Sequence, residues 1–305
     1  MRKYILKRLI ASFICLIGIS LIVFIAVRLS GDVTQLLLPE DAKKEDFVKL
    51  RAELGLDKPL PVQYLIFVKE AVKGNFGQST RFTRPAMELV LGRLPATLQL
   101  ASMAFFIAVV LGVLFGVTSA QKRGSLIDFL VRIGALIGQS MPNFWLGLMF
   151  ILVISVQFEL LPTSGRGGIS HMILPAVTLS LFSIAAISRL SRSAMLNVLG
   201  SDYIKMARLK GCSEKRVIWK HALKNAAIPV ITLAGLQLAQ VIGYGVIVET
   251  VFAWPGLGKL IVDAVFSRDY AVVQAGVTLL SVIYIIINMG VDLLYGVLDP
   301  QIRYE

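Results

Sequence analysis

Charge is scarce in this chain, and it is missing altogether from six long stretches. Asp, Glu, Lys and Arg make up only 16% of the 305 residues, and 56% of the residues are hydrophobic; a soluble domain carries about 25% charged residues. The uncharged windows are 19 to 28 residues long and cover 9–27, 94–121, 133–158, 167–188, 225–248 and 270–291. A helix of that length crosses the hydrocarbon core of a bilayer. The sequence therefore predicts an all-α polytopic membrane protein with six transmembrane helices.

Cysteine and histidine are rare, and they form no pattern that indicates a metal, redox or catalytic site. Cys15 lies in an apolar window and Cys212 in a basic loop, so a disulfide between them is not expected. His171 and His221 lie far apart in the sequence. We find no nucleophile elbow, glycine-rich phosphate loop or zinc-ligand spacing. The sequence therefore predicts no catalytic residue, no metal site and no cofactor bound by this chain, and it disfavours a membrane enzyme.

Ionisable side chains are absent from the interior of the predicted spans. Ion-driven carriers and channels usually have such residues within the membrane. Asp128, Glu249 and Asp292 lie at or beyond the ends of the windows, where a solvated helix end is the simpler interpretation. A proton- or sodium-driven mechanism is therefore poorly supported, and the energy for any transport is expected to come from a separate protein.

The formal net charge of +12 has a simpler explanation than nucleic-acid binding, which we do not expect. In membrane proteins Lys and Arg gather in cytoplasmic loops and fix the topology. The longest polar interruption among the later windows, residues 189–224, holds nine Lys or Arg residues against Asp202 and Glu214. We call this segment the basic loop. The charge pattern predicts that the basic loop and both termini are cytoplasmic.

The windows divide the chain into three parts. Residues 1–29 are predicted to form a basic cytoplasmic tail and the first transmembrane helix. A cleaved signal peptide is the alternative, but its apolar region is usually only 7–15 residues long. Residues 30–93, with ten basic and nine acidic side chains, are predicted to be an extracytoplasmic insert with helix-like stretches at 43–54 and 62–72. Residues 94–305 are predicted to form the core domain of five transmembrane helices that carries the basic loop.

A short helix is predicted within the basic loop over residues 202–210, because Ser201 or Asp202 can cap its start and Gly211 can end it. Tyr203, Ala207 and Gly211 fall four residues apart, so they share one face. An aromatic ring beside two small residues suits close contact with another protein. We therefore predict that a cytoplasmic partner docks on this helix.

Two other features bear on a transport pathway. Pro142, Pro175 and Pro229 lie within windows, where prolines are expected to kink helices. The loop 249–270 has Trp254 in a turn, followed by a predicted amphipathic helix at about 257–266. This loop is either an interfacial helix anchored by Trp254 or a re-entrant piece that shapes the outer mouth of a pathway, and both interpretations stay open.

Residues 201–229, SDYIKMARLKGCSEKRVIWKHALKNAAIP, resemble the coupling motif of permeases in binding-protein-dependent ABC importers. Within these, they resemble the dipeptide/oligopeptide/nickel group. Further matching segments are MPNFW at 141–145, LPTSG at 161–165, ILP at 173–175, VETVFAWPGLG at 248–258, RDY at 268–270 and LDPQIRY at 298–304. The N-terminal tail with its single span, LGLDKPLPVQY at 54–64 and GNFGQS at 74–79 are similar to the first-permease type. The chain departs from the broader E-A-A-x3-G motif in having Lys205 in place of the Glu, as this group does.

The resemblance implies a type I ABC importer permease fold and a non-catalytic subunit in the bacterial inner membrane. It also implies a second homologous permease, two cytoplasmic ATPase subunits that hold ATP and Mg²⁺, and an extracytoplasmic binding protein. The ATPase-coupling residues it implies are Asp202, Tyr203, Ala207, Arg208, Lys210, Gly211 and His221. The pathway and outer-gate residues it implies are Met141, Pro142, Trp145, Trp254, Pro255, Gly256 and Gly258. Arg208 and Lys210 are expected to pair with acceptors on the ATPase, whereas Arg189 and Arg192 are expected to fix topology and bind membrane lipid phosphates.

The sequence does not identify the substrate. Members of the group import di- and oligopeptides, glutathione, or nickel and other metal chelates, and we rank peptides first because the windows contain no cluster of metal-binding side chains. The alternative from another class of protein is a membrane receptor or scaffold subunit whose basic loop binds a signalling partner. The absence of any effector module disfavours it.

Overall fold

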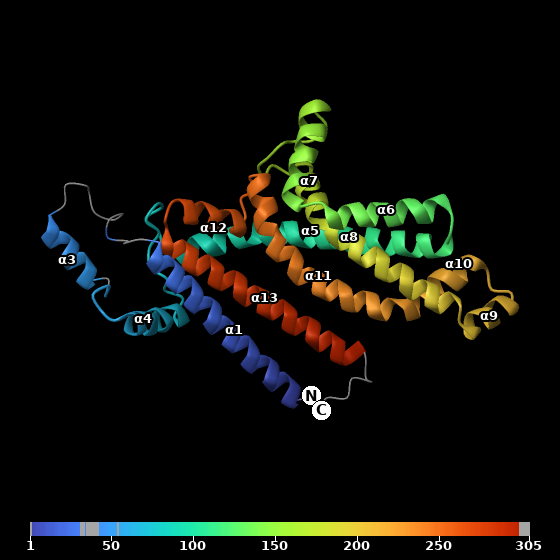
Figure 1. Cartoon of the computed structure of the whole chain (residues 1–305), viewed down its shortest axis with the longest axis horizontal. Helices are drawn as coiled ribbons and strands as arrows, with labels where there is room; N and C mark the ends of the chain where they lie inside the picture. Colours follow the sequence, from blue (N-terminus) through green and yellow to red (C-terminus); the bar gives the residue numbers. More distant parts are fainter. Residues whose placement is uncertain (1, 31–33, 35–42, 54, 299–305) are drawn as a thin grey trace. The chain divides into compact units, whose positions relative to one another are not determined.

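The computed structural model describes residues 2–30, 34, 43–53 and 55–298 (Figure 1). Every regular element in this part of the chain is helical, apart from one isolated bridge between Gln78 and Pro85. The residues form two compact units, Met1–Pro95 with Gly256–Ile285 and Ala96–Pro255 with Ile286–Glu305. We call them the first and second units. The prediction of an all-α fold is confirmed.

Five described helical segments are long and apolar enough to cross a membrane. They are α1 (Arg2–Leu29), α5 (Ala86–Gln121), α8 (Ile169–Leu199), the segment Glu214–Val251 that ends in α11 (Leu223–Val251), and α13 (Tyr270–Leu298). They match five of the six predicted windows, all of which they contain apart from residues 167 and 168. The α5 helix begins at Ala86, so the last eight residues of the segment 30–93, which was predicted to be the insert, are already helical.

The remaining window, 133–158, is not one continuous helix. The chain forms α6 (Leu126–Ser140), breaks at Met141 and Pro142, and continues as α7 (Asn143–Phe150) and the π-helical η1 (Ile151–Gln157). The two halves meet at 108°, so a sixth crossing exists only if this bent pair counts as one span. Met141 and Pro142 are both extended, and a proline cannot donate the backbone hydrogen bond that would continue the helix. Pro175 and Pro229 lie inside α8 and α11, which continue through them.

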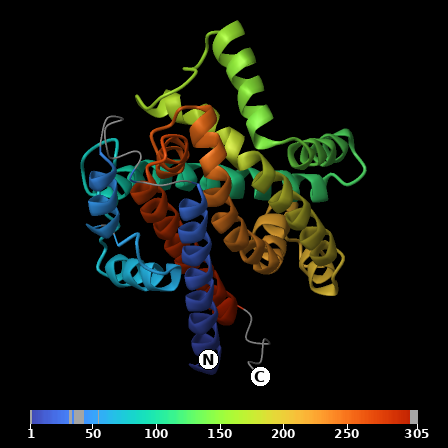
Figure 2. The same ribbon diagram turned by 60° about the vertical axis from the view of Figure 1, so that its left-hand side comes forward.

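The first unit joins the insert to the first span. The predicted helix-like stretches are confirmed as α3 (Lys44–Glu53) and α4 (Leu60–Val72). The α4 helix lies beside α1 (Figure 2), where the Tyr64 hydroxyl is 2.8 Å from Ser20 Oγ and the Tyr64 ring meets Phe24 edge-on. Ser79 donates a buried hydrogen bond to Asp269, in the turn before α13. The helix predicted at 257–266 is confirmed as α12 (Leu257–Phe266).

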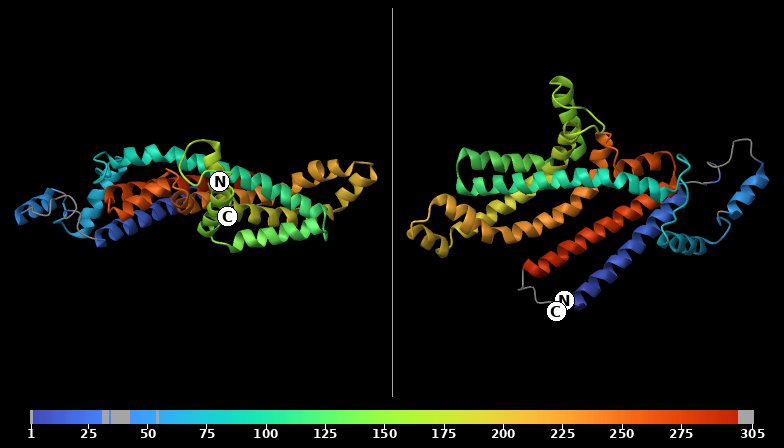
Figure 3. Two further views of the ribbon diagram at one scale, coloured as in Figure 1. Left: turned by 90° about the horizontal axis from the view of Figure 1, so that it is seen from above. Right: turned by 180° about the vertical axis from the view of Figure 1, so that it is seen from behind.

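In the second unit, α8 packs against α6, α7 and α11, and the views of Figure 3 show α6 running alongside it. Glycines let α5 approach α8 closely. A Cβ atom added at Gly116 would lie 2.4 Å from Ser191 Cβ and 2.6 Å from Ser188 O, and one at Gly112 would lie 2.8 Å from Ile187 Cβ. Small residues at helix contacts are typical of membrane proteins.

Candidate coupling site

The basic loop is an ordered extension of the second unit. After α8 come α9 (Asp202–Leu209), α10 (Glu214–Arg216) and a π-helical segment, η2 (Val217–Ala222), which leads into α11. The helix predicted at 202–210 is thus confirmed. Its predicted side-chain cap is wrong: Ser201 precedes α9 in an extended conformation, but its hydroxyl donates to Val198 O at 2.6 Å instead.

One side of α9 is anchored in the core. Ile204 is fully buried and belongs to a cluster that includes Met195 of α8, Val217 and Ala222 of η2, and Ala226 of α11. Ala207 packs at the edge of this cluster. A force applied to α9 therefore reaches two long helices through direct packing. In the sequence, the sign of this anchor is an apolar residue, Ile204, within a strongly basic segment.

The other side of α9 is exposed. Tyr203, Met206 and Lys210 are exposed and lie three to four residues apart, so they share a face that Ala207 borders. The Tyr203 hydroxyl also accepts a hydrogen bond from Asn225 Nδ2 at 2.6 Å, which ties α9 to the first turn of α11. Sequence reasoning missed Met206 and Asn225, although the spacing of Met206 from Tyr203 was available.

Arg208 has a partner within the chain. Its Nε donates to Glu214 Oε1 at 2.7 Å and its Nη2 to Oε2 at 3.3 Å, so a two-point contact links α9 to α10. Asp202 accepts a hydrogen bond from Lys205 Nζ at 2.8 Å. In the sequence Glu214 is one of only two acids in the basic loop; in the structure it holds Arg208 in place and thereby shapes the exposed end of the loop.

Gly211 determines the backbone turn after α9, and His221 lies in the π-helical segment that follows. Gly211 has φ +78°, and a Cβ atom there would meet nothing within 4 Å, so the glycine is required by its backbone conformation rather than by lack of space in this chain. His221 is half-buried within η2. Short π-helical segments are frequent at functional sites.

A buried ion pair lies near the other end of the basic loop. Arg192 of α8 donates to Asp128 of α6 through Nε at 2.8 Å and Nη2 at 3.0 Å, and Ser119 of α5 donates to the same carboxylate at 2.5 Å. Asp128 is 1% exposed. Two predictions are therefore wrong: Asp128 is not at a solvated helix end, and Arg192 is held by Asp128 rather than left for lipid phosphates. The pair connects three helices of the second unit.

The residues predicted to form a pathway or outer gate fall in both units. Met141 and Pro142 form the break before α7, and Trp145 is exposed on α7. Trp254 is 1% exposed, and its Nε1 donates to Ala96 O at 2.9 Å. Because its ring is buried within the protein, the interpretation of Trp254 as an interfacial anchor is wrong.

The other predicted gate residues lie on either side of the boundary between the units. Pro255 ends the first segment of the second unit, while the buried Gly256 and Gly258 lie in the first unit at the start of α12. Nearby, Glu249 was expected at a solvated end but is fully buried and accepts a hydrogen bond from Thr97 at 2.5 Å. The C-terminal end of α11 and the turn after it are therefore buried and hydrogen-bonded within the protein.

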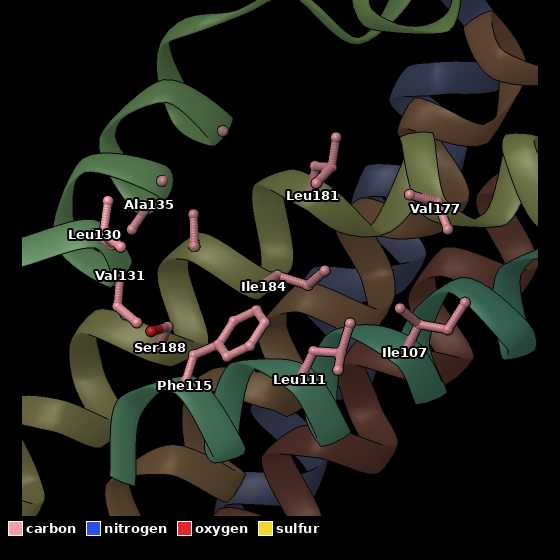
Figure 4. Close-up of a pocket in the computed structure, with 13 residues that line it drawn as sticks. Ile107, Leu111, Phe115, Leu130, Val131, Ala135, Val177, Leu181, Ile184 and Ser188 are labelled. Atoms are coloured by element: carbon pink, nitrogen blue, oxygen red, sulfur yellow. The ribbon is translucent and has the colours of Figure 1, made fainter. Parts of the chain in front are cut away.

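An apolar cavity of about 400 Å³ lies between α5, α6 and α8 in the second unit (Figure 4). Phe115, Leu130 and Ile184 are among its lining residues, and Ser188 supplies the only polar side chain. The cavity can accept an apolar group, but none of its lining residues is charged, so it has no side chain that would bind an ionic group. Among the described residues, no three His, Cys, Asp or Glu side chains are grouped so as to hold a metal ion.

Comparisons with known proteins agree with this architecture. The family model described as the binding-protein-dependent transport system inner membrane component matches residues 112–304, and its N-terminal companion matches residues 1–101. The dipeptide permease DppB of Escherichia coli (strain K12) is 40% identical over 338 residues, and the oligopeptide permease AppB of Bacillus subtilis (strain 168) is 40% identical over 316 residues. The glutathione permease GsiC of Salmonella paratyphi A is 40% identical over 306 residues. All three alignments cover both chains completely.

Solved structures show the same fold at low identity. A chain of the inward-facing MetNI methionine ABC transporter has a TM-score of 0.58 and 20% identity, covering 70% of this chain and 97% of its own length. An amino acid ABC transporter with histidines has a TM-score of 0.54 and 16% identity, covering 68% and 93% respectively.

The helical spans and these matches define a multi-pass permease of the inner membrane. The chain belongs to the family of inner-membrane components of binding-protein-dependent transport systems, and it is a permease subunit of an ABC importer. The predicted resemblance to the dipeptide and oligopeptide branch is confirmed. Permeases of this family are not themselves catalytic.

Proposed function

We propose that this chain forms half of the translocation pathway for di- and oligopeptides, which an extracytoplasmic binding protein delivers. The support is the full-length identity of 40% to a dipeptide permease and to an oligopeptide permease. Glutathione is the second candidate substrate, because the glutathione permease is equally similar at 40% identity. Glutathione is itself a modified tripeptide, so the two candidates belong to related chemical classes.

We further propose that the transporter contains two ATPase subunits, which bind ATP and Mg²⁺, and that one of them docks on the exposed face of α9. The observation that carries this proposal is the two-sided character of α9. Ile204 is locked into the core, while Tyr203, Met206 and Lys210 are exposed on the other side. Closure of the ATPase pair would push α9, and the packing around Ile204 would pass the movement to α8 and α11. His221 and Gly211 would then shape the segment that moves.

This mechanism requires the basic loop and both termini to be in the cytoplasm and the insert to be on the extracytoplasmic side of the membrane. Nine Lys or Arg residues in 189–224 support it, since cytoplasmic loops are enriched in basic residues. A second, homologous permease would complete the pathway. Met141, Pro142, Trp145, Trp254, Pro255, Gly256 and Gly258 remain our candidates for its outer gate.

Purification in mild detergent followed by mass spectrometry tests the proposed assembly. We expect a second permease and one or two ATPases to accompany the chain, and the complex to hydrolyse ATP. Uptake of labelled dipeptides and of labelled glutathione by proteoliposomes, with the binding protein supplied, then separates the two substrates. Isolation of the folded chain alone, with no ATPase, would contradict the proposal.

A further inference from the structure

A shallow groove of about 450 Å³ in the second unit combines cations with exposed apolar side chains. Phe129, Ile133 and Leu136 of α6 form its apolar side, and Arg132, Arg189 and Arg192 of α6 and α8 supply its charge. The three apolar side chains are 38–58% exposed. Neither the coupling role nor the pathway role proposed above uses this groove.

The cations of the groove are not equivalent. Arg192 is neutralised by its two-point contact with Asp128. Arg132 is more weakly engaged, since its Nε is 3.6 Å from the same carboxylate and its side chain is 54% exposed. Arg189 is exposed. Three arginines and one aspartate leave two positive charges, and these belong chiefly to Arg132 and Arg189.

The buried pair also fixes the walls of the groove. Asp128 is in the first turn of α6, and Arg192 is two turns from the end of α8. Their contact holds α6 and α8 together at the position where Arg132 and Arg189 emerge. The two cations are thus presented by helices that are already joined, which lowers the entropic cost of binding one anion between them.

We propose that this groove binds the headgroup of an anionic phospholipid such as phosphatidylglycerol. Arginine guanidinium groups form paired hydrogen bonds with phosphate oxygens, and the exposed Phe129, Ile133 and Leu136 give the start of an acyl chain an apolar surface. A free phosphate ion would gain nothing from those side chains. Arg189 and Arg192 directly follow the uncharged part of α8, which is long and apolar enough to cross a membrane, and lipid headgroups lie at the ends of such spans. The proposal depends on the membrane span of α8 and not on the identity of the substrate or of the ATPase.

The test compares the lipids retained by the purified full chain in nanodiscs of phosphatidylglycerol and phosphatidylcholine. Native mass spectrometry measures retained lipid for the wild type, the double variant Arg132→Gln/Arg189→Gln, and the control Lys122→Gln/Arg123→Gln. The control removes the same charge from exposed residues of the adjoining loop. The groove variant loses the paired hydrogen bonds from guanidinium groups to the phosphate, and a hydrogen bond to a charged group changes affinity roughly tenfold or more. We therefore expect the groove variant to bind phosphatidylglycerol at least about tenfold less tightly, and the control, which keeps the groove, to resemble the wild type.

Three results would overturn the proposal. The first is equal loss of phosphatidylglycerol in the control, which would mean that only net charge matters. The second is displacement of the lipid by inorganic phosphate at millimolar concentration, which would indicate an anion site without lipid recognition. The third is loss of bound lipid when the ATPase or the second permease assembles, which would make the groove a protein contact. Unchanged melting temperatures show that a variant is folded.

Discussion

Asp128 and Arg192 lie 64 residues apart in the sequence and form a buried two-point ion pair that joins α6 to α8. Ser119 and the backbone N–H of Gly124 complete the hydrogen bonding of the carboxylate. Because Asp128 is 1% exposed, its charge is tolerated only while Arg192 is present. The pair therefore holds α6, the first half of the bent span, against α8, the helix that follows the span.

Removing one member of this pair is expected to destabilise the chain. Asp128→Asn leaves a largely buried guanidinium without a counter-charge, and breaking a buried pair in this way costs about 3–5 kcal/mol. The double variant Asp128→Leu/Arg192→Met removes both charges and is expected to recover most of that loss. Thermal unfolding in mild detergent measures both. A double variant no more stable than the single variant would show that the pair itself is not the cause.

Gly116 is expected to be irreplaceable where α5 meets α8. Gly116→Ala places a methyl group 2.4 Å from Ser191 Cβ and 2.6 Å from a backbone carbonyl, so the helices must separate at a cost of about 1–3 kcal/mol. Gly92, in the same helix, has nothing within 4 Å of an added Cβ. Gly92→Ala is therefore the matched control, and it is expected to leave the melting temperature unchanged or slightly higher. Equal effects of the two substitutions would contradict the described packing.

The effect of a substitution at Gly211 is expected to depend on whether the new residue accepts a positive φ, and not on the size of its side chain. At φ +78°, Asn is accepted far more readily than a β-branched residue. Gly211→Asn should retain substrate uptake, whereas Gly211→Val should abolish uptake and leave membrane insertion intact. Uptake assays with immunoblots of the membrane fraction distinguish the two. Loss of uptake in both variants would mean that the space around Gly211 is filled by a partner.

The link between Arg208 and Glu214 is expected to matter for coupling more than for stability. The two side chains are 41% and 59% exposed, and an exposed ion pair contributes only about 0–1 kcal/mol. Glu214→Arg should lower the ratio of substrate transported to ATP hydrolysed, because α9 is no longer held to α10. The exchange Arg208→Glu/Glu214→Arg should restore it in part. A ratio unaffected by the single substitution would remove the pair from the coupling pathway.

The local features of this protein were predictable from the sequence. Five windows became membrane-length helices, and α9 and α12 formed at the predicted positions although Ser201 does not cap α9, because helix formation depends on residues close together in the chain. The pairing of Asp128 with Arg192 and of Glu249 with Thr97 was not predictable. Each joins helices far apart in sequence, and an acid at the end of an apolar window looks the same whether it is solvated or buried.

The bend within the window 133–158 shows a second limit on what the sequence predicts. Pro142 marked a kink, but a proline alone does not set its size. The angle of 108° arises because Met141 is also extended and because α7 then packs against α8 and α11. Gly147 faces Phe252 at the end of α11, where an added Cβ atom would lie 3.1 Å from the ring. Tertiary contacts therefore decide where the second half of this span goes.

Site-specific photo-crosslinking in the assembled transporter tests the central claim, that α9 is where the ATPase acts. A photoreactive residue at Met206, which is 53% exposed on α9, should crosslink to an ATPase subunit. The same residue at Phe266, which is 85% exposed at the end of α12, should not. An ATPase crosslink from position 266, or none from position 206 in an active complex, would contradict both the docking site and the orientation of the chain in the membrane.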